Sequence, residues 1–211
     1  YYLAGLGRGL IEEALPLEPS ARDSQLRSAR TARERARTLD PSDPDHARHL
    51  GALLRIQAWA WRDARASEEP LAEADRLYAQ ATELAPALPP LWIEWARVEI
   101  ERDRLPQALE KVARAIALDE SRADAWLLRG QIHARQQNAR EALADFDGAL
   151  DRGLRNPDLL RGRAMTLAEL RRYDEARAAV NEALAVAPAD ADLLSLRTRL
   201  AAPPSPKDAR D

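Results

Sequence analysis

The chain has 211 residues, 45% of them apolar, which is enough to fill the core of one domain or of a short stack of repeats. Its 32 basic and 35 acidic side chains leave a formal net charge of −3, so it lacks the domain-wide basic field that nucleic-acid binding requires. Cysteine is absent, which excludes disulfides and thiolate sites, and no run of 18 apolar residues is present to span a membrane.

Helix-forming residues dominate the composition. Glycine occurs only 8 times, and alanine, leucine, arginine and glutamate are abundant. The sequence therefore predicts an all-α protein.

The N-terminus offers two interpretations. Tyr1 and Tyr2 precede Gly5 and Gly9, which are four residues apart. A small-residue face with aromatic anchors is typical of a membrane boundary and predicts an upstream membrane anchor, whereas close packing of a soluble helix would use the same glycines. The chain begins without methionine, which suggests an upstream part, and we favour a membrane-tethered periplasmic location over the cytoplasm.

A long helix is expected after the start signal of Ser42, Asp43 and Pro44. Apolar residues keep helical spacing through Leu50, Leu53, Leu54, Gln57, Ala58 and Trp61. This spacing predicts a helix over about residues 44 to 65. The alternative is an ordinary helix followed by a long loop before Pro70.

From residue 89 onward the sequence repeats every 34 residues without a gap, in frames that begin at Pro89, Ala123 and Pro157. Each frame has a characteristic residue size at five positions. These are Trp92, Trp126 and Leu160 at position 4; Ala96, Gly130 and Ala164 at 8; Ala108, Ala142 and Ala176 at 20; Val112, Phe146 and Val180 at 24; and Ala115, Ala149 and Ala183 at 27. Small residues let paired helices approach closely, and large residues fill the space between them.

This pattern resembles the tetratricopeptide repeat. The resemblance implies a right-handed superhelical solenoid of antiparallel helix pairs, with regular repeats at 89–122, 123–156 and 157–190. The frame extends backward to Ala74, Tyr78 and Ala81, so residues 42–88 are expected to form a repeat lengthened by 11 residues. Eleven residues are about three helical turns, so a lengthened helix would keep its apolar face on the same side.

The two ends of the predicted solenoid, residues 1–202, differ from its middle. Residues 1–41 are expected to form a degenerate first helix pair, because Arg33 stands at the normally apolar position 24. Residues 191–202 are expected to form a capping helix, since an end repeat must cover the apolar face of its neighbour. Residues 203–211 are expected to be disordered.

The resemblance also implies a concave groove lined by positions 2, 5, 9 and 12 of the first helices. These positions are Ile93, Arg97 and Ile100, then Asp124, Leu127, Gln131 and Ala134, then Asp158, Arg161, Met165 and Ala168. Such a mixed surface suits an extended or helical peptide with some acidic character. The lysine and asparagine with which some family members clamp a chaperone's terminal carboxylate are absent, which argues against that partner.

Two further features have competing explanations. His46 and His49 lie three residues apart beside Asp43 and Asp45 and could share a metal, but no third neutral ligand is evident, so surface histidines are the simpler interpretation. Trp59 lies on a second stripe of the long helix, where it would either pack against the preceding helix or serve as an interface anchor.

The leading hypothesis is a non-catalytic scaffold that binds a protein or peptide partner, without a cofactor, small-molecule substrate or nucleic acid. A weaker resemblance, to bacterial envelope accessory proteins, suggests a role in assembling envelope or polysaccharide machinery. A cytosolic regulatory adaptor is one alternative. A metal-binding or catalytic protein that uses His46 and His49 is the other.

Overall fold

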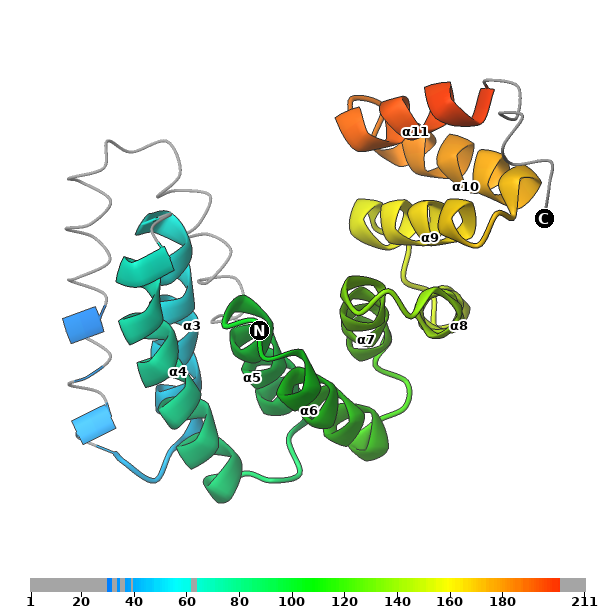
Figure 1. The fold of residues 1–211 in the computed structure, drawn as a ribbon. Helices are drawn as coiled ribbons and strands as arrows, with labels where there is room; N and C mark the ends of the chain where they lie inside the picture. The colour runs from blue at the N-terminus through cyan, green and yellow to red at the C-terminus, as the bar shows by residue number, and fades with distance from the viewer. Residues whose placement is uncertain (1–29, 32–33, 35–36, 39, 62–63, 202–211) are drawn as a thin grey trace. The chain divides into compact units, whose positions relative to one another are not determined.

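The computed structural model describes residues 30–31, 34, 37–38, 40–61 and 64–201, and all regular structure in this part of the chain is helical (Figure 1). Consecutive helices pack as pairs, α3 with α4, α5 with α6, α7 with α8 and α9 with α10. The predicted all-α class and the sequential antiparallel helix pairs are therefore confirmed. None of the helices in these ranges has the length and apolarity needed to cross a bilayer.

The chain divides into two compact units at residue 118. In unit 1 the described helices are α3 (Pro44–Trp61), α4 (Ala64–Leu84), α5 (Pro89–Glu101) and α6 (Leu105–Leu118). In unit 2 they are α7 (Ala123–Arg135), α8 (Ala139–Asp151), α9 (Pro157–Glu169), α10 (Tyr173–Val186) and α11 (Ala191–Ala201).

The first helices of the regular repeats begin at the three frame positions, Pro89, Ala123 and Pro157, and each is 13 residues long. The start of α9 has both a side-chain cap and a proline in its first turn. The Asn156 side chain accepts a hydrogen bond of 2.9 Å from the backbone N–H of Leu159, and Pro157 follows at a position where no N–H is needed.

The turn inside each regular repeat also recurs at 34-residue spacing. Asp103, Gln137 and Arg171 have φ angles of 57°, 63° and 59°, so each adopts the left-handed conformation although none is glycine. This conformation ends the first helix and lets the second fold back on it. It costs a non-glycine residue about 1–2 kcal/mol.

The lengthened repeat uses its extra residues in both helices. α3 has 18 residues and α4 has 21, against 13 or 14 in the regular repeats. The expected lengthened helix is present, but it ends at Trp61, earlier than predicted. The alternative of a long loop before Pro70 is wrong, because Pro70 lies inside α4, which begins at Ala64.

In two of the helix pairs, a glycine of the first helix lies directly against an aromatic ring of the second helix. A Cβ atom on Gly51 of α3 would lie 2.7 Å from the ring of Tyr78, and one on Gly130 of α7 would lie 2.7 Å from the ring of Phe146. Both rings are fully buried. In the other two repeats, position 8 is alanine and position 24 is valine. The residue sizes at these two positions therefore change together.

The C-terminal helix caps unit 2, as predicted. Leu193, Leu196 and Leu200 of α11 are buried in one cluster with α9 and α10, whereas Asp192 and Arg199 are exposed. Asp190 begins this helix: its Oδ1 atom accepts 3.0 Å hydrogen bonds from the N–H groups of Asp192 and Leu193.

The predictions for residues 1–29 and for the tail at 203–211 lie outside the described residues, as does the Arg33 position. Parts of the preceding segment are described. Arg30 donates to Glu73 at 2.7 Å and Arg37 donates to Gln80 at 3.4 Å, so these two residues contact α4 two turns apart.

Candidate functional site

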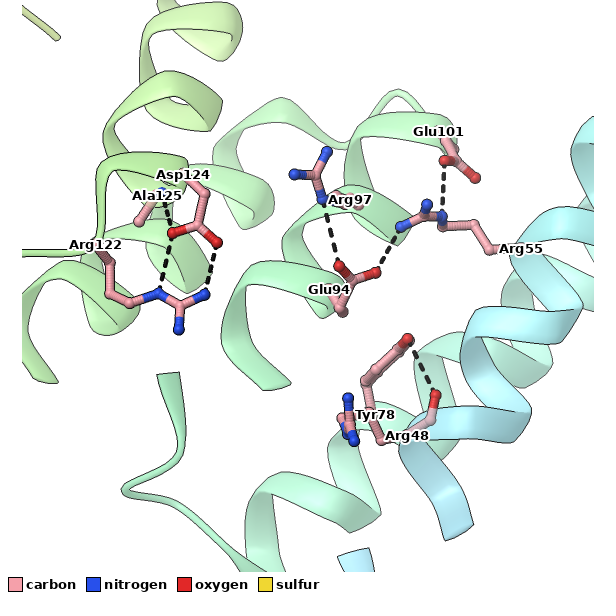
Figure 2. Close-up of polar contacts among 9 residues, drawn as sticks. All are labelled: Arg48, Arg55, Tyr78, Glu94, Arg97, Glu101, Arg122, Asp124 and Ala125. Carbon is pink, nitrogen blue, oxygen red and sulfur yellow. Dashed lines mark hydrogen bonds and ion pairs between the residues drawn. The ribbon is translucent and has the colours of Figure 1, made fainter. Parts of the chain in front are cut away.

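In unit 1, the first helices α3 and α5 are joined by an ion-pair network. Arg55 of α3 donates to Glu94 at 2.7 Å and lies 3.1 Å from Glu101, both on α5 (Figure 2). The two glutamates are seven residues apart, so they project from the same face of α5. Burial lowers the pKa of Arg55, but the two carboxylates outweigh this and raise it above its ordinary value.

Arg97 is the more available cation of this face. Its Nε atom lies 3.6 Å from Glu94, which is beyond hydrogen-bond distance, while Glu94 is held more closely by Arg55. The Arg97 side chain is 35% exposed. It therefore keeps donors for a partner. Ile93, at the predicted groove position before it, is only 2% exposed and offers almost no contact area, whereas Ile100 is half-buried.

In unit 2, the predicted groove residues of α7 are largely engaged within the chain. Asp124 accepts two hydrogen bonds from Arg122, at 2.6 and 3.0 Å, and one from the N–H of Ala125 at 3.1 Å (Figure 2). Leu127 is 7% exposed and packs with Phe146 and its neighbours. Gln131 and Ala134 are half-buried. Of the predicted groove residues on α7, Gln131 and Ala134 therefore remain for contact with a partner.

The α9 part of this face is more open. Met165 is 41% exposed, although methionine is apolar. One turn before it, Arg161 is 35% exposed and pairs with Asp158 at 2.7 Å and with Asp190 at 3.0 Å. Ala168, one turn after Met165, is half-buried. Helices α7 and α9 are in contact, so the predicted groove positions of unit 2 lie on neighbouring helices.

A buried charge cluster lies where α4, α5 and α6 meet. Asp75 accepts from the indole N–H of Trp95 at 2.7 Å and from Arg102 at 2.6 Å. Glu99 is 4% exposed, and its Oε2 atom has no hydrogen-bond partner among the described residues. Burial and the nearby Asp75 carboxylate raise the pKa of Glu99 above its ordinary value. Nothing in the sequence spacing indicated this cluster.

Comparison with known proteins agrees with the geometry of the helix pairs. A model of the tetratricopeptide-repeat family matches residues 93–153 and 134–192. Residues 93–192 of the chain are therefore similar to tetratricopeptide repeats. The matched residues begin in α5 and run into α11, so they include most of the first regular repeat, the two that follow and the start of the cap.

Solved tetratricopeptide-repeat structures share the fold over most of the chain. YrrB, a TPR protein with an unusual peptide-binding site, superposes with a TM-score of 0.64 and 19% identity over 90% of each chain. MamA gives a TM-score of 0.66 and 15% identity over 79% of this chain and 91% of its own. A thermophilic TPR protein of Thermus thermophilus, TTC0263, gives 0.62 and 21% identity, over 92% and 97%. At these identities the likeness concerns the fold alone.

A curated relative matches a shorter stretch. The human protein O-mannosyl-transferase TMTC3 is 32% identical over 88 residues, which are 41% of this chain and 10% of that protein. The chain thus spans only a tenth of the length of this relative.

The histidines near the start of α3 occupy different surroundings. His46 is partly exposed, with its Nε2 atom 3.7 Å from a carboxylate oxygen of Asp43. His49 is 7% exposed, and its Nε2 atom lies 3.0 Å from a guanidinium nitrogen of Arg48. That Nε2 atom must accept the hydrogen bond, since arginine has no acceptor. Among the described residues, no group of three or more metal-ligating side chains is present.

The tryptophans at position 4 of the repeat have the same structural contact. The indole N–H of Trp92 donates to the carbonyl of Pro86 at 2.9 Å, and that of Trp126 donates to the carbonyl of Glu120 at 3.0 Å. Each indole therefore links its helix by a hydrogen bond to the backbone carbonyl six residues earlier. The side chain of Trp59, the predicted interface anchor, lies outside the described part of the chain.

Sequence reasoning missed Arg55 as part of the first-helix face. A signal was available, because Glu94 and Glu101 stand seven residues apart on one side of a predicted helix, where one cation from a neighbouring helix can pair with both. The 11-residue irregularity hid the register of α3, so its arginine could not be aligned with the later repeats.

Proposed function

We propose that the chain is a non-catalytic scaffold that binds a protein or peptide partner through the first-helix faces of its repeats. One observation carries the proposal. Met165, a large apolar side chain, is 41% exposed on α9, one turn from the partly exposed Arg161, and α9 packs beside α7. An apolar contact flanked by a cation can anchor a peptide side chain and orient a neighbouring carboxylate.

The cations of these faces define the preferred partner further. Arg97 makes no hydrogen bond to Glu94, so it can donate to a partner carboxylate without breaking one. Arg161 would have to exchange Asp158, its exposed neighbour, for such a carboxylate. A peptide with an aliphatic residue and at least one acidic residue therefore fits the α9 face of unit 2, and an acidic peptide fits Arg97 in unit 1. The presence of a peptide-binding site in YrrB, a protein of the same fold, supports a peptide as the partner.

The test begins with peptides selected for binding to the purified chain. Met165→Glu is expected to weaken binding by about tenfold or more, because a carboxylate would replace an apolar contact. Val186→Glu is the matched control, since Val186 is 51% exposed but lies on the second helix α10. The proposal fails if both variants weaken binding equally, or if Met165→Glu has no effect.

A second comparison concerns charge. Arg97→Glu is expected to weaken the binding of acidic peptides, whereas Arg114→Glu, an exposed arginine on the second helix α6, should not. Salt should weaken wild-type binding and have less effect on the Arg97 variant, because exposed charge pairs are screened. An unchanged affinity in the Arg97 variant would remove this residue from the site.

The biological setting is a separate proposal that rests on sequence resemblance. A role in assembling bacterial envelope or polysaccharide machinery predicts that the chain co-purifies with components of that machinery and depends on Met165 for doing so. A cytosolic adaptor would co-purify with soluble proteins instead. Recovery of only soluble partners would contradict the envelope role while leaving the scaffold proposal intact.

A further inference from the structure

A cavity of about 160 Å³ lies between α10 and α11 in unit 2, apart from the α7–α9 face. Each helix contributes three residues with helical spacing: Arg177, Val180 and Asn181 from α10, and Arg197, Leu200 and Ala201 from α11. Residues three and four apart lie on the same side of a helix, so both helices turn one side toward the cavity.

The lining combines an apolar floor with a polar rim. Val180 is fully buried and Leu200 is 7% exposed, so both belong to the core beneath the cavity. Arg177, Asn181 and Arg197 are exposed and stand at its edges. The floor favours an apolar group, and the rim offers only donors and one amide carbonyl.

The two arginines differ in how they are held. Arg177 donates from Nε to the carbonyl of Leu200 at 3.0 Å and from Nη1 to Asp174 at 2.8 Å, so its guanidinium group is positioned in advance. Its bond to Leu200 also satisfies one of the last carbonyls of α11. Across the described part of the chain, Arg197 makes no ion pair or hydrogen bond. The described residues that line the cavity include no acidic side chain, but Asp174 beside them offsets the charge of Arg177, so Arg197 is the cation that remains uncompensated among the described residues.

We propose that this cavity binds a carboxylate carried on a compact apolar group. The apolar group would rest on Leu200 and Ala201, above the buried Val180, and the carboxylate would lie between the guanidinium groups of Arg177 and Arg197. The size is appropriate, because a cavity of about 150 Å³ is enough to hold benzene. Two cations on opposite helices can bind the two oxygens of one carboxylate, and charge-assisted hydrogen bonds of this kind are the strong ones.

The site can be tested with benzoate, using amide chemical shifts of the full chain as the measurement. Benzoate is expected to shift the amides of Asn181, Arg197 and Leu200 in a saturable manner, whereas benzamide, which has the same ring but no charge, should bind at least about tenfold more weakly. N-acetyl-leucine and its amide test the same chemistry as it would occur at the end of a protein chain. Tighter binding of N-acetyl-leucine than of benzoate assigns the site to a chain terminus, and the reverse assigns it to a free acid.

Variants then locate the binding. Arg197→Gln should keep the fold, since Arg197 has no partner to lose among the described residues, and should weaken benzoate binding about tenfold or more. Arg199→Gln is the matched control, because Arg199 is an exposed arginine of the same helix outside the cavity lining. The proposal is overturned if benzamide binds as well as benzoate, if Arg197→Gln binds benzoate like the wild type, or if no carboxylate produces saturable shifts.

Discussion

A Cβ atom placed on Gly130 would lie 2.7 Å from Cε1 of Phe146, closer than non-bonded contacts of real Cβ atoms. Gly130→Ala should therefore destabilise the chain, since the buried ring cannot move away without disturbing its neighbours. We expect a loss of about 1–3 kcal/mol in the free energy of unfolding, measured by urea denaturation. An unchanged or raised stability would show that the ring has room to move.

The same contact predicts a reversal of sign in a second background. Phe146→Val alone should destabilise by leaving a cavity. Once the ring is gone, alanine at 130 should be better than glycine by about 1 kcal/mol, because alanine is the stronger helix former. A double-mutant cycle measures this coupling, and strictly additive effects would contradict it.

The spacing of small and large residues shows how much of the fold the sequence could predict. The 34-residue frame predicted the starts of α5, α7 and α9, because the spacing of small and large residues is imposed directly by helix packing. The lengthened repeat was harder, since either helix could absorb 11 residues and Pro70 resembles a helix start. Groove membership was inferred from position alone, and position does not reveal that Ile93 is buried while Arg97 is partly exposed.

The left-handed turn between α7 and α8 predicts a stabilising substitution. Gln137 has φ 63°, which costs an ordinary residue about 1–2 kcal/mol. Gln137→Gly removes that cost but makes the unfolded chain more flexible, so the net gain should be about 0.5–1 kcal/mol. Gln136→Gly is the control, because Gln136 has φ −82° and should only lose stability. Thermal unfolding of the two variants distinguishes them, and a loss of stability in both would contradict the argument.

The network of Arg55 predicts a loss of stability in unit 1. Arg55→Met would leave Glu94 and Glu101 partly buried without their shared cation. A loss of about 1–3 kcal/mol is expected, between the values for exposed and for buried pairs. Adding Glu94→Gln should recover part of it, because one uncompensated carboxylate is then removed. The control Arg76→Met changes an exposed arginine of α4, and an equal loss there would mean that the network contributes nothing.

Glu99 predicts how stability depends on pH. Its carboxylate is buried among charged groups from three elements. The acidic neighbours are Asp75 and Glu68 of α4. The basic neighbours are Arg102 and Arg104, at the end of α5 and in the following turn, and Lys111 of α6. Burial and Asp75 raise the pKa of Glu99 in the folded chain above its value in the unfolded chain, so the unfolded state holds fewer protons between the two values. The stability that protonated Glu99 contributes is fully present below the unfolded pKa and is lost as pH rises through the folded pKa.

Glu99→Gln should therefore be more stable than the wild type at pH 7, because the amide needs no costly ionised form in the core. The advantage should shrink as pH falls toward about 4.5, the ordinary value for glutamate, where wild-type Glu99 is increasingly protonated. Urea denaturation across this range measures the difference, with Glu110→Gln, an exposed glutamate on α6, as the matched control. A difference that stays constant with pH, or one that grows as pH falls, would show that the surrounding arginines and Lys111 keep Glu99 ionised at ordinary pH.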